Sequence, residues 1–313
     1  MARRRPEESD IRIRPAKSTR RRSKDRPSHS DSIAAQVITV DRGRTLCRIA
    51  SGQLVSAMKA RELGKNSVVV GDLVNIVGDV SGDTGSLARI VAVQPRRNSL
   101  SRTIDDAGAF EKTIAANLDQ MIIVAASADP SPRQGFIDRC LAVAFDQGIK
   151  PIIVMSKADL ADPDEFLSAY RDLEVEYLKL KRGDDLTQLH KILEAKVSVL
   201  IGHSGVGKST LVNALLGIEK RDTGDVNLTT GRGRHTSSSA ISFELPNGGW
   251  IIDTPGVRSF GLEHIDKSRV IASFTEFASV IANCPKNCSH DEATCALNNY
   301  VKTSPQASSR LAS

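Results

Sequence analysis

The sequence predicts a multidomain protein in which a small β-barrel is followed by an α/β domain and then by a small α-helical, metal-binding domain. Three observations lead to this fold class. Short β-rich segments separated by turn residues occupy residues 33–93. Continuous apolar runs alternate with helical periodicity over residues 121–201. Three cysteines and one histidine lie close together within residues 284–295.

The overall composition is that of an ordinary soluble protein, with 40% hydrophobic and 26% charged residues among 313. No apolar run approaches the roughly 18 residues that a membrane-spanning helix needs. The N-terminus also lacks the apolar segment of a secretion signal. We therefore expect a cytoplasmic protein without a membrane partner, in a compartment where cysteines stay reduced.

The basic residues are concentrated at the N-terminus. Residues 1–30 contain 11 Lys or Arg against 4 Asp or Glu, a net charge of +7, whereas the whole chain carries +6. A segment so rich in charge and Ser, with few large apolar side chains, buries too little surface to fold. We expect residues 1–32 to form a disordered tail that attracts phosphate backbones. A solubilising leader and an organelle transit peptide are the alternatives.

The predicted barrel has five short strands. Turn residues such as Gly71-Asp72 and Gly78 separate them, and they are expected at 35–40, 45–49, 68–70, 73–77 and 87–93. An oligonucleotide-binding (OB) barrel fits this pattern, although an SH3-like barrel would produce nearly the same one. No Phe, Tyr or Trp precedes Phe110, so base stacking is not expected here. RNA contact by the barrel would therefore depend on its shape or on four basic side chains, those of Arg42, Arg44, Arg48 and Arg61. The alternative is that these arginines only solvate the outside of the barrel.

An α/β domain begins after a polar linker that contains Arg96, Arg97 and Arg102. The apolar runs 121–126 and 151–155 are typical of strands buried on both faces. Between them, apolar residues at spacings of three and four predict a helix over 134–147 that ends at Gly148. This alternation predicts a doubly wound parallel sheet that binds its ligand at the carboxyl ends of the strands.

A phosphate loop follows the apolar run 197–201. The segment Gly202-His203-Ser204-Gly205-Val206-Gly207-Lys208-Ser209 fits the pattern Gly-x-x-x-x-Gly-Lys-Ser/Thr, and a helical pattern begins at Thr210. Backbone N–H groups of such a loop surround a phosphate group at a helix N-terminus. We expect Lys208 to reach the β- and γ-phosphates and Ser209 to bind Mg²⁺. A Gly-rich turn that matches by chance is the alternative.

The segment Ser156-Lys157-Ala158-Asp159 stands directly after the run 151–155 and resembles the guanine-recognition motif Asn/Thr-Lys-x-Asp of GTPases. In that motif the Asp carboxylate accepts two N–H donors that adenine lacks. The Ser156 hydroxyl can make only part of the contacts of an amide. We therefore expect Asp159 to maintain guanine selectivity with some loss of affinity. A surface Lys-Ala-Asp turn is the alternative interpretation.

Two further nucleotide motifs lie downstream of the phosphate loop. The first, Gly231-Arg232-Gly233-Arg234-His235-Thr236, would supply a switch threonine, Thr236, for Mg²⁺. The second, Asp253-Thr254-Pro255-Gly256, follows an apolar run, so that Asp253 would position the Mg²⁺ shell and the Gly256 N–H would sense the γ-phosphate. Because the guanine motif precedes the phosphate loop, the order predicts a circularly permuted GTPase domain.

The C-terminal region combines an amphipathic stretch with a compact set of metal ligands. Apolar residues recur from Val270 to Ile281 and lead into Cys284-x3-Cys288-x-His290-x4-Cys295. Three thiolates and one imidazole are typical of a closed tetrahedral Zn²⁺ site. Free core thiols are the alternative, which the polar neighbours of these cysteines argue against. Cys47 and Cys140 are expected to be ordinary buried thiols.

This order of motifs resembles the small-ribosomal-subunit-dependent GTPase A family, over residues 33 to about 310. The resemblance implies an OB-fold domain at 33–98, a permuted GTPase domain at 99–262 and a zinc domain at 263–313. It also implies that the protein binds rRNA, hydrolyses GTP when stimulated by the small subunit, and acts in late maturation of that subunit. We expect the protein to be a monomer. The sequence departs from the family in its shorter metal-ligand spacing, in Lys179-Leu180-Lys181 where Ser-Ala is usual, and in its short C-terminal segment.

Hydrolysis needs a group that orients water, and the position after Gly256 is Val257, where many GTPases carry Gln. We therefore expect slow intrinsic hydrolysis, completed by His235 when RNA orders its loop, with Thr236 and Lys208 as the other catalytic residues. Arg232 and Arg234 are available to phosphate. Alternatively, His235 only contacts RNA. Two other functions remain open: an RNA-binding assembly factor with GTP as a structural ligand, and a P-loop ATPase or kinase.

Overall fold

The computed structural model describes ten segments of the chain, residues 29–41, 43–64, 67–103, 111–173, 175–218, 240–246, 248–254, 265–286, 288–290 and 292–312. Most of the predicted tail lies outside these segments. So do Arg42 and the nucleotide-motif residues His235, Thr236 and Gly256. Residues Ser32–Ser313 form one compact unit.

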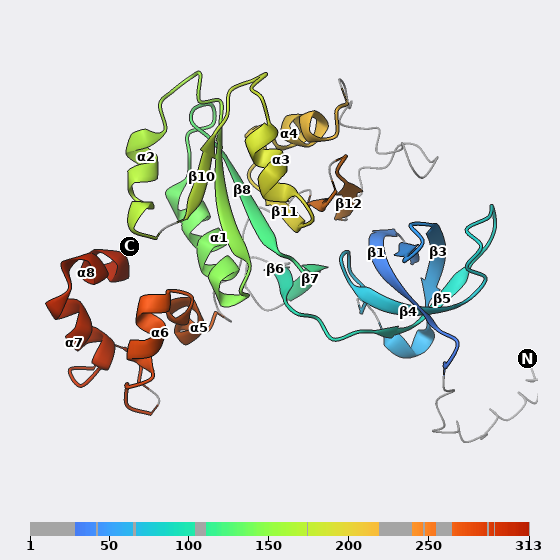
Figure 1. The fold of residues 1–313 in the computed structure, drawn as a ribbon, viewed down its shortest axis with the longest axis horizontal. Helices are drawn as coiled ribbons and strands as arrows, with labels where there is room; N and C mark the ends of the chain where they lie inside the picture. The colour runs from blue at the N-terminus through green and yellow to red at the C-terminus, as the bar shows by residue number, and fades with distance from the viewer. Residues whose placement is uncertain are drawn as a thin grey trace, which may run out of the picture. The chain divides into compact units, whose positions relative to one another are not determined.

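The first five strands close into a barrel (Figure 1). They are β1 (Ile33–Asp41), β2 (Arg44–Ile49), β3 (Leu54–Lys59), β4 (Leu73–Gly78) and β5 (Ala88–Val93). Strand β1 pairs with both β2 and β4, β3 pairs in parallel with β5, and β5 pairs antiparallel with β4. This five-stranded circuit is OB-like, and it buries an apolar interior that includes Val37, Cys47 and Ile76.

The third barrel strand is not the one that the sequence predicted. Residues 68–70 make only an isolated bridge from Val70 to Ala115, and the strand lies at Leu54–Lys59 instead. Val55 and Ala57 are fully buried in this strand. Its exposed positions carry Ser56 and Met58, so that the alternation is weak in the sequence. The 3-10 helix η2 (Arg61–Leu63) follows it.

A buried ion pair holds the segment around residues 68–72 in place. The Asp72 side chain has 0% exposure and accepts two hydrogen bonds from the Arg96 guanidinium, at 2.7 and 2.9 Å. Its carboxylate also accepts the backbone N–H of Val69 at 2.8 Å. Asp72 therefore takes the place of a strand partner for Val69, which explains why this apolar run is not a strand.

We expect Asp72→Ala to lower the free energy of unfolding by about 3 kcal/mol, because it leaves a partly buried guanidinium and a backbone N–H without their partner. Urea denaturation of the full chain measures this change. Arg89→Ala is the control because Arg89 pairs with Glu62 on the surface, 3.4 Å apart. That variant should cost less than about 1 kcal/mol. Equal destabilisation by both substitutions would contradict the assignment.

The predicted polar linker contains a β-hairpin, which the sequence analysis missed. Strands β6 (Ser99–Thr103) and β7 (Glu111–Ala116) pair antiparallel as a separate two-stranded sheet. Leu100 and Ala115 face inward and are fully buried. The other positions are mostly Ser, Thr, Lys and Arg, so the sequence of this hairpin is too polar to stand out as a pair of strands.

The α/β domain has the predicted parallel sheet, in the order β10-β9-β8-β11-β13-β12. All neighbours are parallel except β12, which runs antiparallel to β13. The strands are β8 (Gln120–Ala126), β9 (Lys150–Ser156), β10 (Glu176–Lys179), β11 (Val197–Ile201), β12 (Ile241–Glu244) and β13 (Trp250–Asp253). The helices between them are α1 (Gln134–Asp146), α2 (Asp164–Ser168), η3 (Arg171–Leu173), α3 (Thr187–Leu193) and α4 (Lys208–Leu215).

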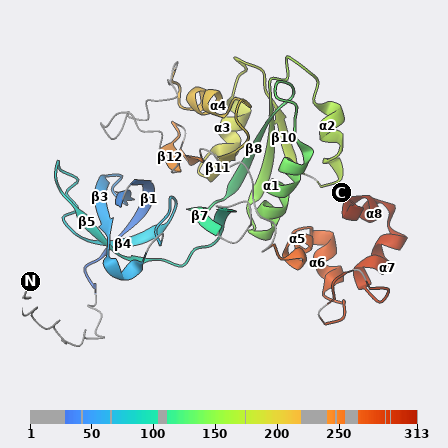
Figure 2. The same ribbon diagram turned by 180° about the vertical axis from the view of Figure 1, so that it is seen from behind.

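Helices cover both faces of this sheet, as Figures 1 and 2 show. Side chains that alternate along β8 enter two different cores, because successive residues of a strand point to opposite faces. Met121 and Ile123 pack with α1 on one face, whereas Ile122 packs with α3 and α4 on the other. Burial on both faces explains the continuous apolar runs. The carboxyl ends of β8, β9 and β11 lie at one edge, where the sequence predicts the nucleotide.

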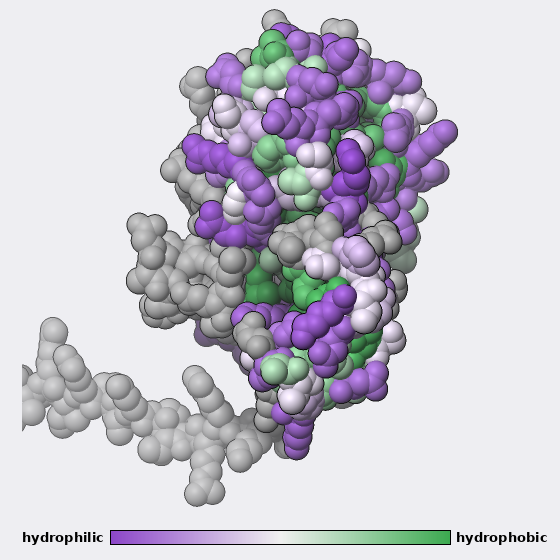
Figure 3. Space-filling view, turned by 90° about the vertical axis from the view of Figure 1, so that its left-hand side faces the viewer, coloured by the Kyte–Doolittle hydropathy of each residue, from purple (hydrophilic) through white to green (hydrophobic). Residues whose placement is uncertain are grey.

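In the described part of the C-terminal region, from residue 265 on, there are four short helices: α5 (Lys267–Ala272), α6 (Thr275–Ile281), α7 (Ala296–Thr303) and α8 (Pro305–Ala312). The predicted amphipathic stretch is thus divided between α5 and α6. Phe277, Cys295, Leu297 and Ala307 form the small buried core. Among the helices that the structure describes, none is both long and apolar enough to cross a membrane. Figure 3 shows hydrophilic residues spread widely over the face that it displays, with hydrophobic residues in smaller groups between them.

Candidate nucleotide and metal sites

The phosphate loop connects β11 to α4, as predicted. Gly205 and Gly207 have positive φ angles of 82° and 89°, which favour glycine because a side chain would clash with the backbone. A Cβ atom on Gly202 would collide with the carbonyl oxygen of Val124 on β8. The glycines therefore permit both the curvature of the loop and its close approach to the neighbouring strand.

The Lys208 ammonium lies inside this loop. It donates hydrogen bonds to the carbonyl of His203 at 3.0 Å and to that of Gly202. Burial lowers the pKa of Lys208, whereas the Asp253 carboxylate opposes this shift. The end of β13 thus lies within electrostatic reach of the phosphate loop, and the Thr254 hydroxyl donates to the carbonyl of Leu200 at 2.9 Å. The Asp253 carboxylate therefore acts on the Lys208 ammonium although 45 positions separate the two residues in the sequence.

The proposed base motif contacts the phosphate loop directly. Ser156 ends β9, and its hydroxyl donates to the carbonyl of Val206 at 2.6 Å. The carbonyl of Ala125, at the end of β8, lies 3.2 Å from the same hydroxyl. Residues 156 and 206 therefore join two segments that the sequence places 50 positions apart. This contact brings the two predicted nucleotide motifs to one edge of the sheet.

Lys157 and Asp159 follow in an exposed turn. Lys157 has a positive φ angle of 54°, and its ammonium donates to the carbonyl of Asp129. The segment after β10 lies alongside, because Leu180 accepts the N–H of Ala158 at 3.1 Å and donates to the carbonyl of Met155 at 2.8 Å. The segment reads Lys179-Leu180-Lys181 where the family usually has Ser-Ala. Its backbone therefore lies beside the base motif.

We expect Ser156→Ala to weaken binding of GDP about tenfold, because loss of this hydrogen bond leaves the Val206 carbonyl without its donor, at a cost of about 1.4 kcal/mol. Ser156→Thr, which keeps the hydroxyl, should bind within about threefold of the unmodified chain. Equilibrium titration with a fluorescent GDP analogue measures both. If alanine and threonine weaken binding equally, the hydroxyl does not position the loop.

Four predicted metal ligands converge in the C-terminal region. The ligand atoms of Cys284, Cys288, His290 and Cys295 all lie within 4.8 Å of one another. The sulfur atoms of Cys284 and Cys295 are 3.8 Å apart, and His290 Nδ1 lies 3.7 and 3.6 Å from them. Tetrahedral bonds of about 2.3 Å to a metal place two sulfur atoms about 3.8 Å apart, so the geometry fits such a site. Asn298 donates to the carbonyl of His290 at 2.9 Å and so supports the loop.

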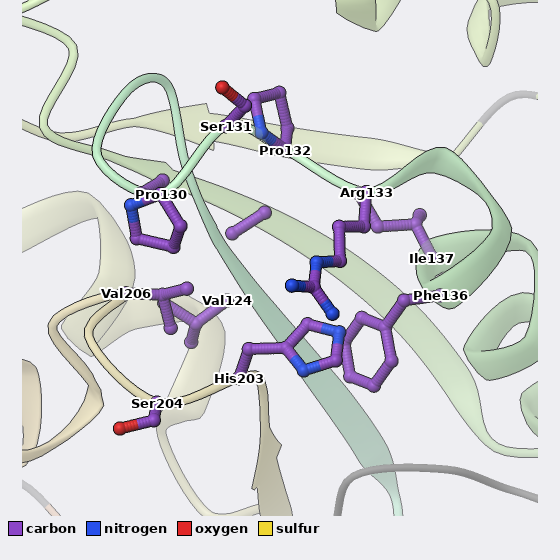
Figure 4. Close-up of a pocket in the computed structure, with 12 residues that line it drawn as sticks. Val124, Pro130, Ser131, Pro132, Arg133, Phe136, Ile137, His203, Ser204 and Val206 are labelled. Atoms are coloured by element: carbon purple, nitrogen blue, oxygen red, sulfur yellow. The ribbon is translucent and has the colours of Figure 1, made fainter.

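A cavity that the sequence analysis did not predict adjoins the phosphate loop (Figure 4). Its volume is about 280 Å³, and its lining includes His203, Phe136 and Arg133. The His203 ring packs on the ring of Phe136, with centroids 4.1 Å apart. Phe136 lies on α1, more than 60 positions before the loop, so that no local pattern indicates this contact.

Comparison with known proteins shows what this chain is similar to. A family model described as RsgA GTPase matches residues 93–263. A protein of Pseudomonas aeruginosa named small ribosomal subunit biogenesis GTPase RsgA is 40% identical over 235 residues, which are 72% of this chain and 68% of the relative. A Nitrosospira multiformis protein of the same name is 38% identical over 258 residues, 79% of this chain and 78% of the relative.

Two solved structures share the fold. YjeQ from Thermotoga maritima aligns with a TM-score of 0.64 and 24% identity, covering 90% of this chain and 96% of that one. YloQ, described as a circularly permuted GTPase, aligns with a TM-score of 0.61 and 20% identity, covering 92% and 96%. The permuted arrangement expected from the motif order is therefore confirmed at the level of the fold.

Proposed function

This chain belongs to the RsgA GTPase family, and we propose that it binds the small ribosomal subunit and hydrolyses GTP to GDP and phosphate during late maturation of that subunit. The names of its relatives support the choice of partner. The observation that supports the mechanism most strongly is the hydrogen bond from Ser156 to Val206, because it brings the base motif against the phosphate loop. A single guanosine nucleotide can then contact both.

In this proposal the base lies against Ser156, Lys157 and Asp159, and the phosphates lie in the loop 202–209, with Thr210 next to it in α4. A GTPase uses Mg²⁺ to neutralise charge that develops between the β- and γ-phosphates. Ser209 is exposed in the first turn of α4, and Asp253 ends the strand beside the loop, so these residues fit the ion. From their places in the sequence motifs, Thr236 would also bind the Mg²⁺ ion and the Gly256 N–H would contact the γ-phosphate.

We propose Zn²⁺ as the metal in the C-terminal region. Three thiols and one imidazole are soft and borderline ligands that suit Zn²⁺ better than Mg²⁺ or Ca²⁺, which prefer oxygen. Four protein ligands leave no open position, so the metal would have a structural role. It would join the loop 284–295 to α7, because Cys295 directly precedes that helix.

Contact with rRNA is proposed for the barrel and for the basic tail. Arg44 and Arg61 are exposed and available to phosphate groups. Arg48 is engaged within the protein, because its guanidinium pairs with Glu244 at 3.0 Å and lies 5.3 Å from the centre of the Trp250 ring. We further propose that the protein acts as a monomer in the cytoplasm, where small subunits mature in bacteria such as those of its relatives.

For catalysis we propose that His235 orients the attacking water when the subunit orders its loop. We expect His235→Ala to lower subunit-stimulated turnover about 100-fold while binding to the subunit persists. Multiple-turnover kinetics and subunit cosedimentation of the same preparation test this. Unchanged turnover with intact binding would show that His235 contacts RNA only.

The function is tested by measuring hydrolysis of GTP with and without purified small subunits. Slow hydrolysis alone and a large stimulation by small subunits, but not by large subunits, are expected. An unchanged rate in the presence of bound subunits would instead favour an assembly factor for which GTP is a structural ligand. ATP in place of GTP is the control, and equal use of ATP would contradict the base motif.

A further inference from the structure

Two adjoining hollows lie beside the phosphate loop. The cavity of about 280 Å³ has apolar walls that include Val206, Pro130 and Pro132. A second hollow of about 270 Å³ lies next to it and is lined by residues 133–136, Arg139 and His203. Arg133, Phe136 and His203 line both. These shared residues therefore form the boundary between the two hollows.

His203 is connected to both the nucleotide site and the hollows. Its carbonyl accepts the Lys208 ammonium, whereas its ring packs on Phe136. Its Nε2 atom is buried and makes no hydrogen bond to any described residue. Figure 4 shows the imidazole edge below the Arg133 guanidinium. A buried polar nitrogen without a partner is costly, and it indicates that a hydrogen-bonding group belongs beside it.

The surroundings of this nitrogen are cationic. Burial lowers the pKa of His203, and the positive charges of Arg133, Lys208 and Arg139 lower it further. Arg133 directly precedes α1, Arg139 lies in the second turn of that helix, and Lys208 lies at the end of the phosphate loop. No Asp or Glu occurs among the described residues that line either hollow. The Asp253 carboxylate acts on Lys208, but no carboxylate of the described lining offsets the charges of Arg133 and Arg139.

We propose that Arg133, Arg139 and His203 bind inorganic phosphate, the product of GTP hydrolysis, beside the phosphate loop. Arg139 Nε already donates to the Gly135 carbonyl at 2.8 Å, which leaves the terminal N–H groups of its guanidinium for an anion. In this proposal each guanidinium donates to oxygens of the phosphate, and His203 Nε2 donates a further hydrogen bond when it is protonated. One wall of the cavity is the loop that would hold the γ-phosphate, so the path from that position is short. This inference uses the hydrolase activity of the family but not the identity of the ribosomal partner.

The test measures binding of sulfate and phosphate to the chain saturated with a non-hydrolysable GTP analogue, which fills the nucleotide site. Isothermal titration should detect one ion per chain. Sulfate does not titrate between pH 6 and 8, so any pH dependence of its binding reports on the protein. Because a bound anion favours protonated His203, sulfate should bind more tightly as pH falls from 8 to 6.

Two sets of variants separate the groups. The double variant Arg133→Gln, Arg139→Gln should bind sulfate and phosphate at least tenfold more weakly. Arg171→Gln, which changes an exposed arginine on η3, should leave the affinity for both ions unchanged. His203→Gln keeps a hydrogen-bond donor but cannot titrate, so sulfate binding should persist and lose its pH dependence. Affinity for the GTP analogue is measured for each variant, which shows that the loop has folded.

The proposal is overturned if neither ion binds, or if the arginine variants bind both ions normally. It is also overturned if a short RNA displaces sulfate while free phosphate fails to saturate the site, because the occupant is then a phosphodiester. None of these readouts requires ribosomal subunits or turnover. If small subunits fail to stimulate hydrolysis, the proposed phosphate site is therefore unaffected. If the anions fail to bind, the proposed ribosomal function is likewise unaffected.

Discussion

Asp159→Asn should change the base preference of this GTPase from guanine to xanthine. The carboxylate is expected to accept the N1 and N2 hydrogens of guanine, and two hydrogen bonds to a charged acceptor are together worth about 3 kcal/mol or more. GTP should therefore bind at least about 100-fold more weakly. Xanthine carries an oxygen where guanine carries its amino group, so an amide can donate to it and XTP should bind better than GTP.

Equilibrium binding of GTP, XTP and ATP to both proteins measures this change. Asp162→Asn is the matched control, because Asp162 is an exposed carboxylate three residues later whose side chain is 75% exposed. That variant should keep the preference for GTP. An Asp159→Asn protein that still prefers GTP would show that the segment 156–159 is only a surface turn.

The second large effect is expected at the metal site. Cys295→Ser should abolish metal binding and unfold the helices around it, because Cys295 belongs to both the ligand set and the small core with Phe277 and Leu297. Structural zinc sites contribute on the order of 10 kcal/mol to the folding of small domains. Four short helices with so small a core cannot replace that contribution.

Metal content by mass spectrometry and limited proteolysis test this prediction together. We expect about one zinc per chain before the substitution and almost none after it, with new cleavage between residues 265 and 312. Cys140→Ala, which removes a buried thiol of the α/β core that is not part of the ligand set, should retain the metal. A Cys295→Ser protein that keeps its zinc and resists cleavage would contradict the assignment.

Strands buried on both faces were predictable because nearly every residue of such a strand is apolar; the exception in β11 is Ser198, whose hydroxyl donates to the Gln120 side chain at 3.1 Å. Residues 197–201 form β11 with the predicted bounds, and the loop after it contains the expected glycines and Lys208. The candidate metal ligands were also predictable, since four ligating side chains lie within 12 positions and a short folded loop is enough to bring them together. These features depend on residues that are neighbours in the sequence, which is the information that motifs and hydrophobic periodicity contain.

Half-exposed strands were harder to predict. Strand β3 shows alternating burial, but its residues Ser56, Ala57 and Met58 carry no strong strand preference. The hairpin of β6 and β7 is held by the burial of Leu100 and Ala115 against Val70 and against residues of the α/β domain that come later in the chain. Such elements form because a tertiary partner covers one side, and that partner is not visible in a local window.

The residues around His203 illustrate the same limit for a site. The phosphate-loop pattern identifies the backbone of this residue, but it leaves the residue type open at that position. The contact with Phe136 and the proximity of Arg133 arise from the packing of α1 beside the loop. Only the folded arrangement brings these three side chains together.

The central claim is that a base motif and a phosphate loop in reversed chain order serve one guanosine nucleotide. A crystal structure of the chain with GDP and Mg²⁺ tests it most directly. We predict one nucleotide, with the Asp159 carboxylate within hydrogen-bond distance of guanine N1 and N2 and with the Lys208 ammonium on the β-phosphate. A nucleotide whose phosphates occupy the loop while its base lies away from Asp159 would contradict the claim.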